Sequence, residues 1–359
     1  MSSADQEWDN FLENDTLQDS KNKNIISNNF IPKATSIYIS TQTKIGYLNQ
    51  KVDLKEIFWK IPIIQYQNTT CGVIKKQIKL SCDTKEESEL LDGKIKNTNM
   101  VIVNIIKFVD NPTARKIKYK DVRKINVGIA KKDLTSYRTK VKGAFYNCFV
   151  VIMRVPYKGV FKEVHIKVFN TGKLEIPGIQ SDDFLVLALD ALITMLTPFC
   201  PEPVSYNNDD IDTVLINSNF TCNYFINRDK LSDVLKYKYH MHVNYDPCSY
   251  PGIQVKFYYN ANKNIQNGVC SCEKRCSKKG SGDGANECLE MSFMIFRTGS
   301  ALIVGHCDIP ILHVVYDFLK NILITDYLDF RIDMEKPEKK KVKNKKIRKK
   351  NIILDLESN

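Results

Sequence analysis

Apolar and polar positions follow the same order in two distant parts of the chain. An alternating or apolar run at 164–169 and another at 291–296 each end in phenylalanine. Each run leads into a Thr-Gly pair, at 171–172 and 298–299, and then into a second short apolar run. Alternation with a period of two predicts β-strands, and glycine supplies the positive φ that a tight turn needs. The pattern therefore predicts two copies of a strand–turn–strand unit.

A helical pattern follows each of these units. Apolar residues recur at three- and four-residue steps over 184–195 and again over 311–322. This spacing places the apolar side chains along one face of a helix, where they can cover a sheet. Each copy is therefore expected to end in a long packing helix.

The segments upstream of the two units also correspond. Residues 36–48 and 213–226 predict opening strands, and a short helix is expected after each. Asp53 with Glu56 forms a capping-box pattern, and Asn227 can cap the second short helix. Each half then reads as strand, short helix, several strands and long helix.

The repeat predicts an α+β fold with two related halves and two insertions. The expected parts are an acidic, disordered tail at 1–33, a first repeat at 34–200 with a basic insertion at 67–143, a second repeat at 201–333 with a cysteine-rich insertion at 260–289, and a lysine-rich tail at 334–359. Insertions of this kind are tolerated in surface hairpins of a fixed scaffold.

Positive charge is concentrated in two of these appendages. The chain has a net charge of +12; residues 67–143 hold 18 Lys/Arg against 8 Asp/Glu, and residues 336–350 hold 10 against 1. Segments of this kind suit a polyanion such as nucleic acid, although a solvated lysine-rich surface is the alternative. No apolar run is long enough for a membrane span, and the acidic N-terminus is unlike a secretory signal. We therefore expect a protein that stays inside a cell and does not bind membranes.

Several strings in the two halves match a known pattern in order and in flanking sequence. They are VDLKEI at 52–57, VIMR at 151–154, VFNTGKLEIPG at 168–178, YPGIQVKFY at 250–258 and MIFRTGSALIVG at 294–305. Together they resemble the TATA-binding protein family over roughly residues 36–66, 144–200 and 212–323. The insertions and the lysine-rich composition resemble a divergent member from a large DNA virus of the mimivirus kind.

The resemblance implies a fold and a function. The family forms a saddle, in which two pseudo-symmetric repeats share one curved antiparallel sheet with helices on its convex face. Such a saddle grips double-stranded DNA in the minor groove and bends AT-rich promoter DNA. The resemblance also implies transcription initiation together with a factor-IIB-like protein and RNA polymerase. The expected location is the nucleus or, for a viral protein, the cytoplasmic viral factory or virion.

The resemblance also assigns DNA contacts to individual residues. Aromatic wedges that enter base steps fall on Phe169 and Phe296, with Tyr250 and Phe149 as their companions. The turn threonines, the groove-reading positions and the backbone-approaching cations fall on Thr171, Thr298, Thr41, Asn217, Ser218, Arg154 and Lys173. Ordinary core packing of the aromatic rings is the alternative for the wedges.

Some positions depart from the family pattern. Glu175 falls where the family has a small apolar groove contact, and a carboxylate there would face phosphate-rich DNA. Thr41 and Ser218 stand in place of asparagines and have a shorter reach. A second hypothesis is therefore a scaffold of the same fold that docks subunits of a transcription complex and binds DNA weakly or not at all.

Four cysteines lie close together in the second insertion. Cys270, Cys272, Cys276 and Cys288 could hold a tetrahedral zinc ion, remain free thiols or form a disulfide. The polar segment has no other obvious core, which favours a structural metal, but the spacing is not a standard finger pattern. The fold itself is not expected to need a cofactor.

No motif in the sequence indicates catalysis. The five histidines are scattered, and the glycine-rich stretch at 278–284 lacks the strand-to-helix setting of a phosphate-binding loop. The sequence therefore predicts a binding protein rather than an enzyme.

Overall fold

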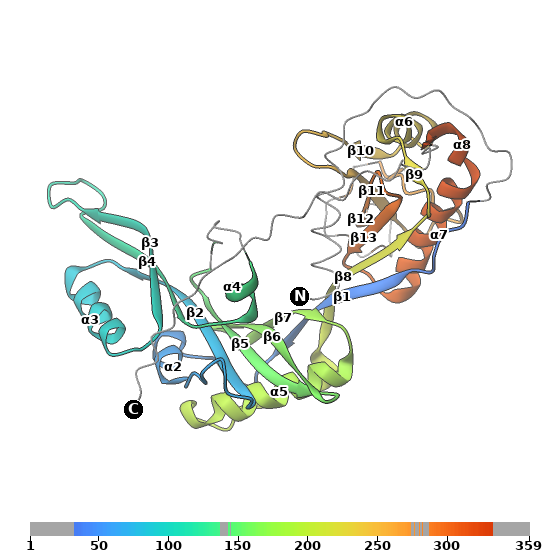
Figure 1. Ribbon diagram of the computed structural model, residues 1–359. Helices are drawn as coiled ribbons and strands as arrows, with labels where there is room; N and C mark the ends of the chain where they lie inside the picture. Colours follow the sequence, from blue (N-terminus) through green and yellow to red (C-terminus); the bar gives the residue numbers. More distant parts are fainter. Residues whose placement is uncertain are drawn as a thin grey trace, which may run out of the picture. The chain divides into compact units, whose positions relative to one another are not determined.

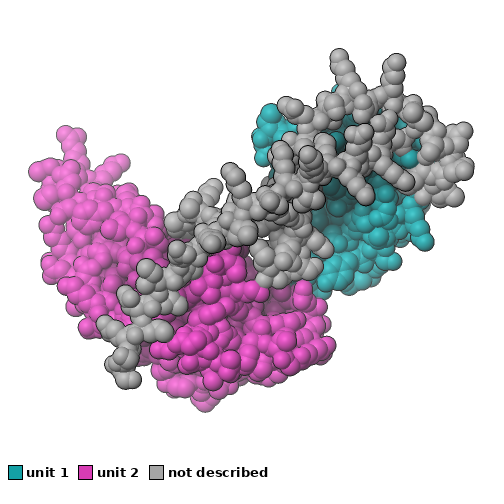
Figure 2. Space-filling view, viewed as in Figure 1, with its two compact units in different colours: residues 1–42, 213–344 teal, residues 43–212, 345–359 magenta. Residues whose placement is uncertain are grey.

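The computed structural model describes residues 32–136, 143, 145–273, 276, 280, 282 and 287–332. The chain divides into two compact units (Figure 2). Of the described residues, 32–42 and 213–332 belong to unit 1, and those between 43 and 212 belong to unit 2. None of the helices in the described part is long and apolar enough to cross a membrane.

Unit 2 is an antiparallel sheet with helices (Figure 1). Its elements are β1 (Tyr38–Tyr47, shared with unit 1), α2 (Leu54–Lys60), β2 (Gly72–Cys82), α3 (Lys85–Lys96), β3 (Val101–Asp110), β4 (Tyr119–Gly128), α4 (Lys131–Thr135), β5 (Cys148–Tyr157), β6 (Val160–Phe169), β7 (Lys173–Ile179), α5 (Asp182–Leu196), η1 (Thr197–Phe199) and η2 (Asn208–Asp210). The strand order is β1-β7-β6-β5-β2-β4-β3.

Unit 1 repeats this plan with shorter strands (Figure 1). Its elements are β8 (Asp212–Thr221), β9 (Phe225–Ile226), α6 (Arg228–Asp233), η3 (Val234–Lys238), β10 (His242–Asn244), β11 (Ile253–Tyr259), β12 (Leu289–Ile295), β13 (Ser300–Gly305), α7 (Ile309–Thr325), α8 (Tyr327–Phe330) and β14 (Arg331–Ile332). The main strand order is β8-β13-β12-β11-β10, and β9 pairs with β14.

The two units share one topology. In each, the opening strand lies beside the last strand of a four-stranded meander: β1-β7-β6-β5-β2 corresponds to β8-β13-β12-β11-β10. A short helix follows each opening strand and a long helix follows each meander. The predicted α+β class and the internal repeat are confirmed.

Equivalent backbone hydrogen bonds hold the turn of each repeat. The N–H of Leu48 donates to the carbonyl of Gly172 at 2.9 Å, and the N–H of Cys222 donates to that of Gly299 at 3.0 Å. The two glycines have φ values of 86° and 81°. A Cβ at Gly172 would lie 2.4 Å from the carbonyl oxygen of Gln50, and one at Gly299 would lie 2.3 Å from that of Tyr224. Both turns therefore need glycine for its φ and for the close backbone approach.

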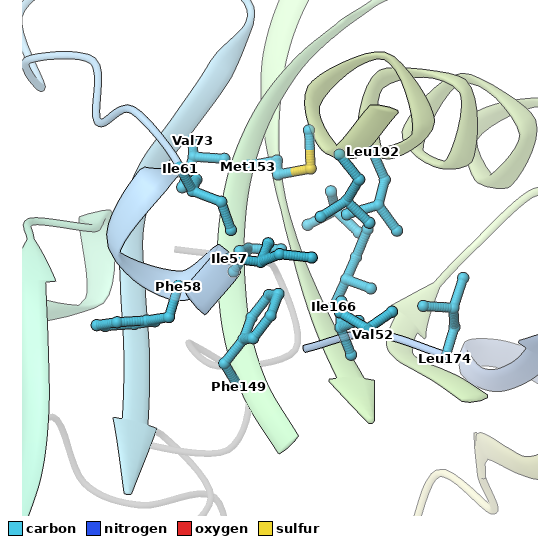
Figure 3. Close-up of a cluster of buried hydrophobic side chains, with 14 of the residues drawn as sticks. Val52, Ile57, Phe58, Ile61, Val73, Phe149, Met153, Ile166, Leu174 and Leu192 are labelled. Atoms are coloured by element: carbon cyan, nitrogen blue, oxygen red, sulfur yellow. The ribbon is translucent and has the colours of Figure 1, made fainter. Parts of the chain in front are cut away.

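Each long helix covers one face of its sheet. In unit 2 the apolar stripe of α5, which includes Leu185, Leu189 and Leu192, packs on β5, β6 and β7 together with α2 (Figures 1 and 3). In unit 1 the stripe of α7, which includes Leu312 and Leu319, packs on the corresponding strands. Alternating apolar positions in the strands meet a helical stripe, so each repeat buries its own core.

The first insertion differs from the expected one at 67–143. Strand β2 belongs to the repeat itself, and the inserted segment runs from residue 83 to residue 147. It is not a surface loop, because β4 pairs with β2 and β3 pairs with β4, which extends the sheet by two strands. The lysines of β2 and its bulge between Val73 and Lys75 interrupt the alternating pattern of apolar residues. The sequence pattern therefore does not predict this strand.

The boundaries of the compact units also differ from 34–200 and 201–333. Ala34, Ile37 and Ile39 pack against the core of unit 1, and the N–H of Thr35 donates to the carbonyl of Thr221 at 2.9 Å. Residues 201–212 belong instead to unit 2, where Val204 is buried in its core. The expected tails, 1–33 and 334–359, lie outside the described residues apart from Pro32 and Lys33.

Candidate nucleic-acid interface

Each sheet has a face opposite its long helix, which we call the distal face. On β6, Val164, Ile166 and Val168 point into the core, so the alternate residues point to the distal face. On β12, the core side chains include Phe293 and Ile295. A DNA contact made by either sheet must come from the alternate positions.

Two predicted wedges of the second repeat meet on the distal face of unit 1. The ring centroids of Tyr250 and Phe296 are 6.0 Å apart with the planes tilted by 59°. Phe296 is only 1% exposed, whereas Tyr250 is half-buried and covers it. The hydroxyl of Tyr250 lies 3.8 Å from the sulfur of Met294, and burial raises the pKa of this hydroxyl. Tyr250 therefore presents the more accessible ring of the pair.

Gly252 makes room for this aromatic pair. A Cβ at this position would lie 2.7 Å from the ring of Phe296 and 3.0 Å from that of Tyr250. The Pro-Gly dipeptide in the sequence thus serves the packing of the two rings.

Phe169 lies at the corresponding place in unit 2. It ends β6, is half-buried, and pairs across the sheet with Cys148. The ammonium of Lys173 lies 6.0 Å from the centroid of its ring. The structure thus brings together two of the residues that the resemblance assigned to DNA contact.

Phe149 occupies the opposite face and cannot serve as the companion of Phe169. It is 0% exposed, belongs to the unit 2 core, and lies 6.4 Å from Phe58 between ring centroids (Figure 3). Successive residues of a strand point to opposite faces, so a shift of one residue from Cys148 moves the ring into the core. The assignment of Phe149 to the interface is therefore wrong in this structure.

The strand register places another aromatic residue at that position. Phe169 pairs with Cys148, and Phe296 and Gly252 each lie one residue beyond the paired Ile295 and Ile253. Tyr146 precedes Cys148 by two residues, as Tyr250 precedes Gly252. Tyr146 is 55% exposed and its neighbour Phe145 is 60% exposed. Sequence reasoning missed both because only the pairing register relates Tyr146 to Tyr250.

Lysines accompany these exposed rings. The ammonium of Lys79 lies 3.8 Å from the ring centroid of Tyr146, and that of Lys167 lies 5.6 Å from that of Phe145. We call Phe145, Tyr146 and Phe169, with Lys79, Lys167 and Lys173, the aromatic–lysine cluster. Cations over ring faces contribute favourable electrostatics, and the same lysines carry the charge that phosphate groups need.

Glu175, the unfavourable carboxylate, has a partner in this region. Lys167 donates a short hydrogen bond to it from the adjacent strand, where the two residues pair in register. The pair partly neutralises the negative charge that would otherwise face a polyanion.

Asn217 and Ser218 lie on opposite faces of β8. Ser218 is 0% exposed and lies on the same face of β8 as the core residues Ile216 and Phe220. Its hydroxyl donates a hydrogen bond to the carbonyl of Ile303 at 3.0 Å. It is therefore not a groove contact in this structure, because its hydroxyl is enclosed on the helix side. Asn217 points to the distal face, and its Oδ1 has no hydrogen-bond partner among the described residues.

The three threonines among the predicted contacts differ in burial and in hydrogen bonding. Thr41 is half-buried on β1. Thr171 is exposed in its turn, and its hydroxyl accepts weakly from the N–H of Lys173 at 3.5 Å. Thr298 is half-buried, and its hydroxyl donates to that of Ser300 at 3.3 Å.

Arg154 is occupied within the protein. Its guanidinium donates to the carbonyls of Tyr66 at 2.9 Å and Asn68 at 2.6 Å, and it stacks over the ring of Tyr66. The side chain is only 8% exposed, so it holds the segment after α2 rather than a phosphate group. The assignment of Arg154 to DNA contact is therefore also wrong in this structure.

Part of the distal face of unit 2 is covered. Ile74 and Ile152 form a small apolar cluster with Ala130, just before α4, and with Ile64 and Tyr66. Lys75 of β2 also forms a salt bridge with Asp133 of α4 at 2.7 Å. The aromatic–lysine cluster uses other positions, mainly on β6, β7 and the segment before β5.

The four cysteines of the second insertion converge. The sulfurs of Cys270, Cys272, Cys276 and Cys288 all lie within 4.8 Å of one another. All four are unpaired thiols in the structure. The structure thus brings the whole predicted set together.

No protein-family model matches the chain. The chain is 26% identical over 207 residues to a protein of Acanthamoeba polyphaga mimivirus described as TATA-box-binding protein-like. The match covers 52% of this chain and 50% of the mimivirus protein, so the chain spans about half the length of that curated relative. Among solved structures, the chain is similar to Methanococcus jannaschii TBP at 13% identity and a TM-score of 0.37, over 82% of this chain and 99% of that one.

The internal repeat and the sequence similarity are independent observations. Each unit has an opening strand, a short helix, a four-stranded meander and a long helix in the same spatial order. The curated relative carries the TATA-box-binding-protein description over a match that covers half of this chain. The chain is thus an internally repeated α+β protein that is similar in sequence, over about half its length, to a TATA-box-binding protein-like protein of a large DNA virus.

Proposed function

We propose that the chain is a transcription initiation factor that binds double-stranded DNA through the distal faces of its two repeats. The observation that carries the proposal is the matched placement of aromatic residues near the same strand ends: Tyr250, which covers the enclosed ring of Phe296, and Tyr146 with Phe169. Aromatic side chains at such positions can wedge between base steps of the minor groove and bend the duplex. AT-rich steps are favoured because they deform more readily.

The charges of unit 2 support this proposal. Lys79 and Lys173 lie over the rings of Tyr146 and Phe169 and can neutralise phosphate groups, while Lys167 lies over Phe145 and neutralises Glu175. Contacts of this kind position a protein on DNA without reading its sequence. We therefore propose binding that follows DNA shape and deformability more than base identity.

The helices supply a surface for protein partners. Val186 and Leu187 on α5 and Ile309 at the start of α7 are exposed apolar side chains on the opposite side from the distal faces. Isolated apolar residues are ordinary on a surface, but helices of the family dock other factors. We propose that a factor-IIB-like protein and RNA polymerase are recruited through these helices.

A scaffold role is the second candidate. It is favoured because Ala130, Ile64 and Tyr66 cover part of the distal face of unit 2. It is also favoured because the guanidinium of Arg154 is hydrogen-bonded within the protein. A protein with this fold would then dock subunits of a transcription complex and bind DNA weakly or not at all.

Fluorescence anisotropy with an AT-rich duplex across a salt series separates the two candidates. We expect the Y146A/F169A variant to bind at least about tenfold more weakly than the wild type, or about 1.4 kcal/mol. Tyr237→Ala is the matched control, because Tyr237 is also an exposed tyrosine beside a lysine but lies on η3. A form lacking residues 336–350 separates the lysine-rich tail from the sheets, and a bending assay on the same duplex tests wedging.

The outcomes distinguish the candidates. Loss of binding and bending in Y146A/F169A, with both retained in Tyr237→Ala and in the truncated form, supports the groove-binding proposal. Binding that depends only on residues 336–350, with no bending, would leave the scaffold role.

A further inference from the structure

The cysteine cluster of the second insertion has the geometry of a single-metal site. The Sγ atoms of Cys270 and Cys276 are 3.5 Å apart, those of Cys272 and Cys288 are 3.6 Å apart, and those of Cys270 and Cys288 are 3.9 Å apart. A tetrahedral zinc ion with Zn–S bonds of about 2.3 Å separates its sulfur ligands by about 3.8 Å. The three sulfur–sulfur distances lie on both sides of that value.

Disulfide pairing does not account for this arrangement. A disulfide joins two sulfurs at about 2.05 Å and leaves the other pair independent. Here Cys270 lies near both Cys276 and Cys288, and all four sulfurs fall within 4.8 Å of one another. Four mutually close sulfurs are arranged around a common centre, which is what one cation requires.

The chemistry of the four thiolate ligands determines which metal ions the site can bind. Four thiolates in a tetrahedron suit zinc or a single iron, whereas carboxylate-rich sites suit magnesium or calcium. A cluster of several irons holds its cysteines on different iron atoms, which moves the sulfurs further apart. Four protein ligands also leave no open position for a substrate, so such a zinc ion is structural.

Neighbouring groups donate hydrogen bonds to the sulfurs. The backbone N–H of Cys288 donates to the sulfur of Cys276 at 3.3 Å. The side-chain amide of Asn260, which is itself 3% exposed, lies 3.6 Å from the sulfur of Cys288. Donors of this kind stabilise thiolates and orient them toward a metal.

The described part of the inserted segment has little apolar core of its own and is held mainly by hydrogen bonds, such as those of Gln266 to the carbonyls of Asn260 and Lys263. Its only apolar cluster among the described residues consists of the four cysteines and Tyr258, and Ile265 is 78% exposed. The segment links β11, which ends at Tyr259, to β12, which begins at Leu289. A metal that joins Cys270 and Cys272 to Cys288 would therefore fasten the segment to the start of a core strand.

We propose that Cys270, Cys272, Cys276 and Cys288 bind one structural zinc ion, which fixes the insertion between β11 and β12 of the second repeat. The proposal is independent of DNA binding, since none of these cysteines belongs to the aromatic–lysine cluster.

Metal analysis of the purified full-length chain tests the proposal. After dialysis against a weak chelator, we expect about one zinc per chain in the wild type. Cys270→Ser and Cys272→Ser should lose most of this zinc, and both residues are half-buried, so their replacement is tolerated by the fold better than that of Cys276 or Cys288. Cys71→Ser and Cys248→Ser are the matched controls, because both thiols are exposed and lie outside the cluster.

A second measurement tests metal binding in the wild type itself, so that it does not depend on whether the variants fold. Replacing zinc with cobalt in the wild type should give the visible absorption bands of tetrahedral thiolate coordination. A strong chelator should lower the Tm of the wild type and of both control variants, but should not lower that of Cys270→Ser further.

Several outcomes would overturn the proposal. They are zinc and cobalt both absent from folded wild type, zinc retained in full by Cys270→Ser and Cys272→Ser, iron in place of zinc, or disulfides among the four cysteines by mass spectrometry under non-reducing conditions.

Discussion

The two repeats share a framework but differ in where they have been enlarged. The first repeat has gained residues 83–147 between β2 and β5, which add two strands and a helix pair and carry many lysines. The second has gained a cysteine-rich segment between β11 and β12. The hydrogen bonds from Leu48 to Gly172 and from Cys222 to Gly299 are the same in both. The comparison teaches that the turn and the order of the meander define this scaffold, while its connections tolerate large additions.

The aromatic ends of the two distal faces differ as well. In the second repeat Phe296 is enclosed by Tyr250 and Gly252, whereas in the first repeat Phe145 and Tyr146 are exposed beside lysines. We infer that the first repeat offers the larger contact surface to a nucleic acid.

The largest effect is expected for Phe149→Ala, which tests the assignment of faces. This change opens a cavity beside Phe58 in the core and should lower the free energy of unfolding by about 3–5 kcal/mol. Phe161→Ala, at an exposed position on β6, should change it far less. Urea unfolding measures both. Near-equal stability of the two variants would contradict the core position of Phe149.

The turn glycines test whether the two repeats are equivalent. Gly172→Ala and Gly299→Ala each combine a positive φ with a Cβ placed too close to a carbonyl oxygen, and each should cost about 2–4 kcal/mol. Gly159→Ala is the control, because it has a φ of 79° but open space around its Cβ, and should cost about 1–2 kcal/mol. Thermal and urea unfolding would measure these costs. If only one of the two turn variants is destabilised, the repeats do not share this constraint.

A smaller effect, on how the free energy of unfolding depends on pH, is expected from the buried Lys76 of β2. The corresponding strand of the second repeat, β10, is much shorter. Burial lowers the pKa of Lys76 to about 8, while its ammonium donates to the carbonyl of Ile61 at 2.6 Å. Below pH 8 the folded and unfolded chains both carry this proton, and folding bears the full cost of burying the charge. Between pH 8 and 10.5 the folded chain releases the proton first, so the folded state gains stability as pH rises.

Lys76→Met should remove that gain. The difference in unfolding free energy between wild type and variant should change by about 1–2 kcal/mol between pH 8 and 10.5, since the carbonyl hydrogen bonds offset part of the desolvation. Urea unfolding at several pH values measures it. Parallel curves for the two proteins across this range would show that the lysine is not buried as a charge.

Local sequence patterns determined the repeat and most of its elements. Alternation predicted β6 and β12, helical spacing predicted α5 and α7, and the Thr-Gly pairs predicted the turns. These features rest on neighbours within a few residues, so the order of side chains along the chain is enough to predict them. The capping residues Asp53 and Asn227 likewise accept hydrogen bonds from the first turns of α2 and α6.

Only the tertiary structure decided which side chains reach the distal face. A shift of one residue separates Phe149 in the core from Cys148 beside Phe169, and pairing register alone relates Tyr146 to Tyr250. Arg154 is held by the carbonyl of Tyr66, which lies 88 residues away in the sequence. Contacts of this range depend on how strands pair and where segments pack, and a one-residue change of register reverses every side chain on a strand.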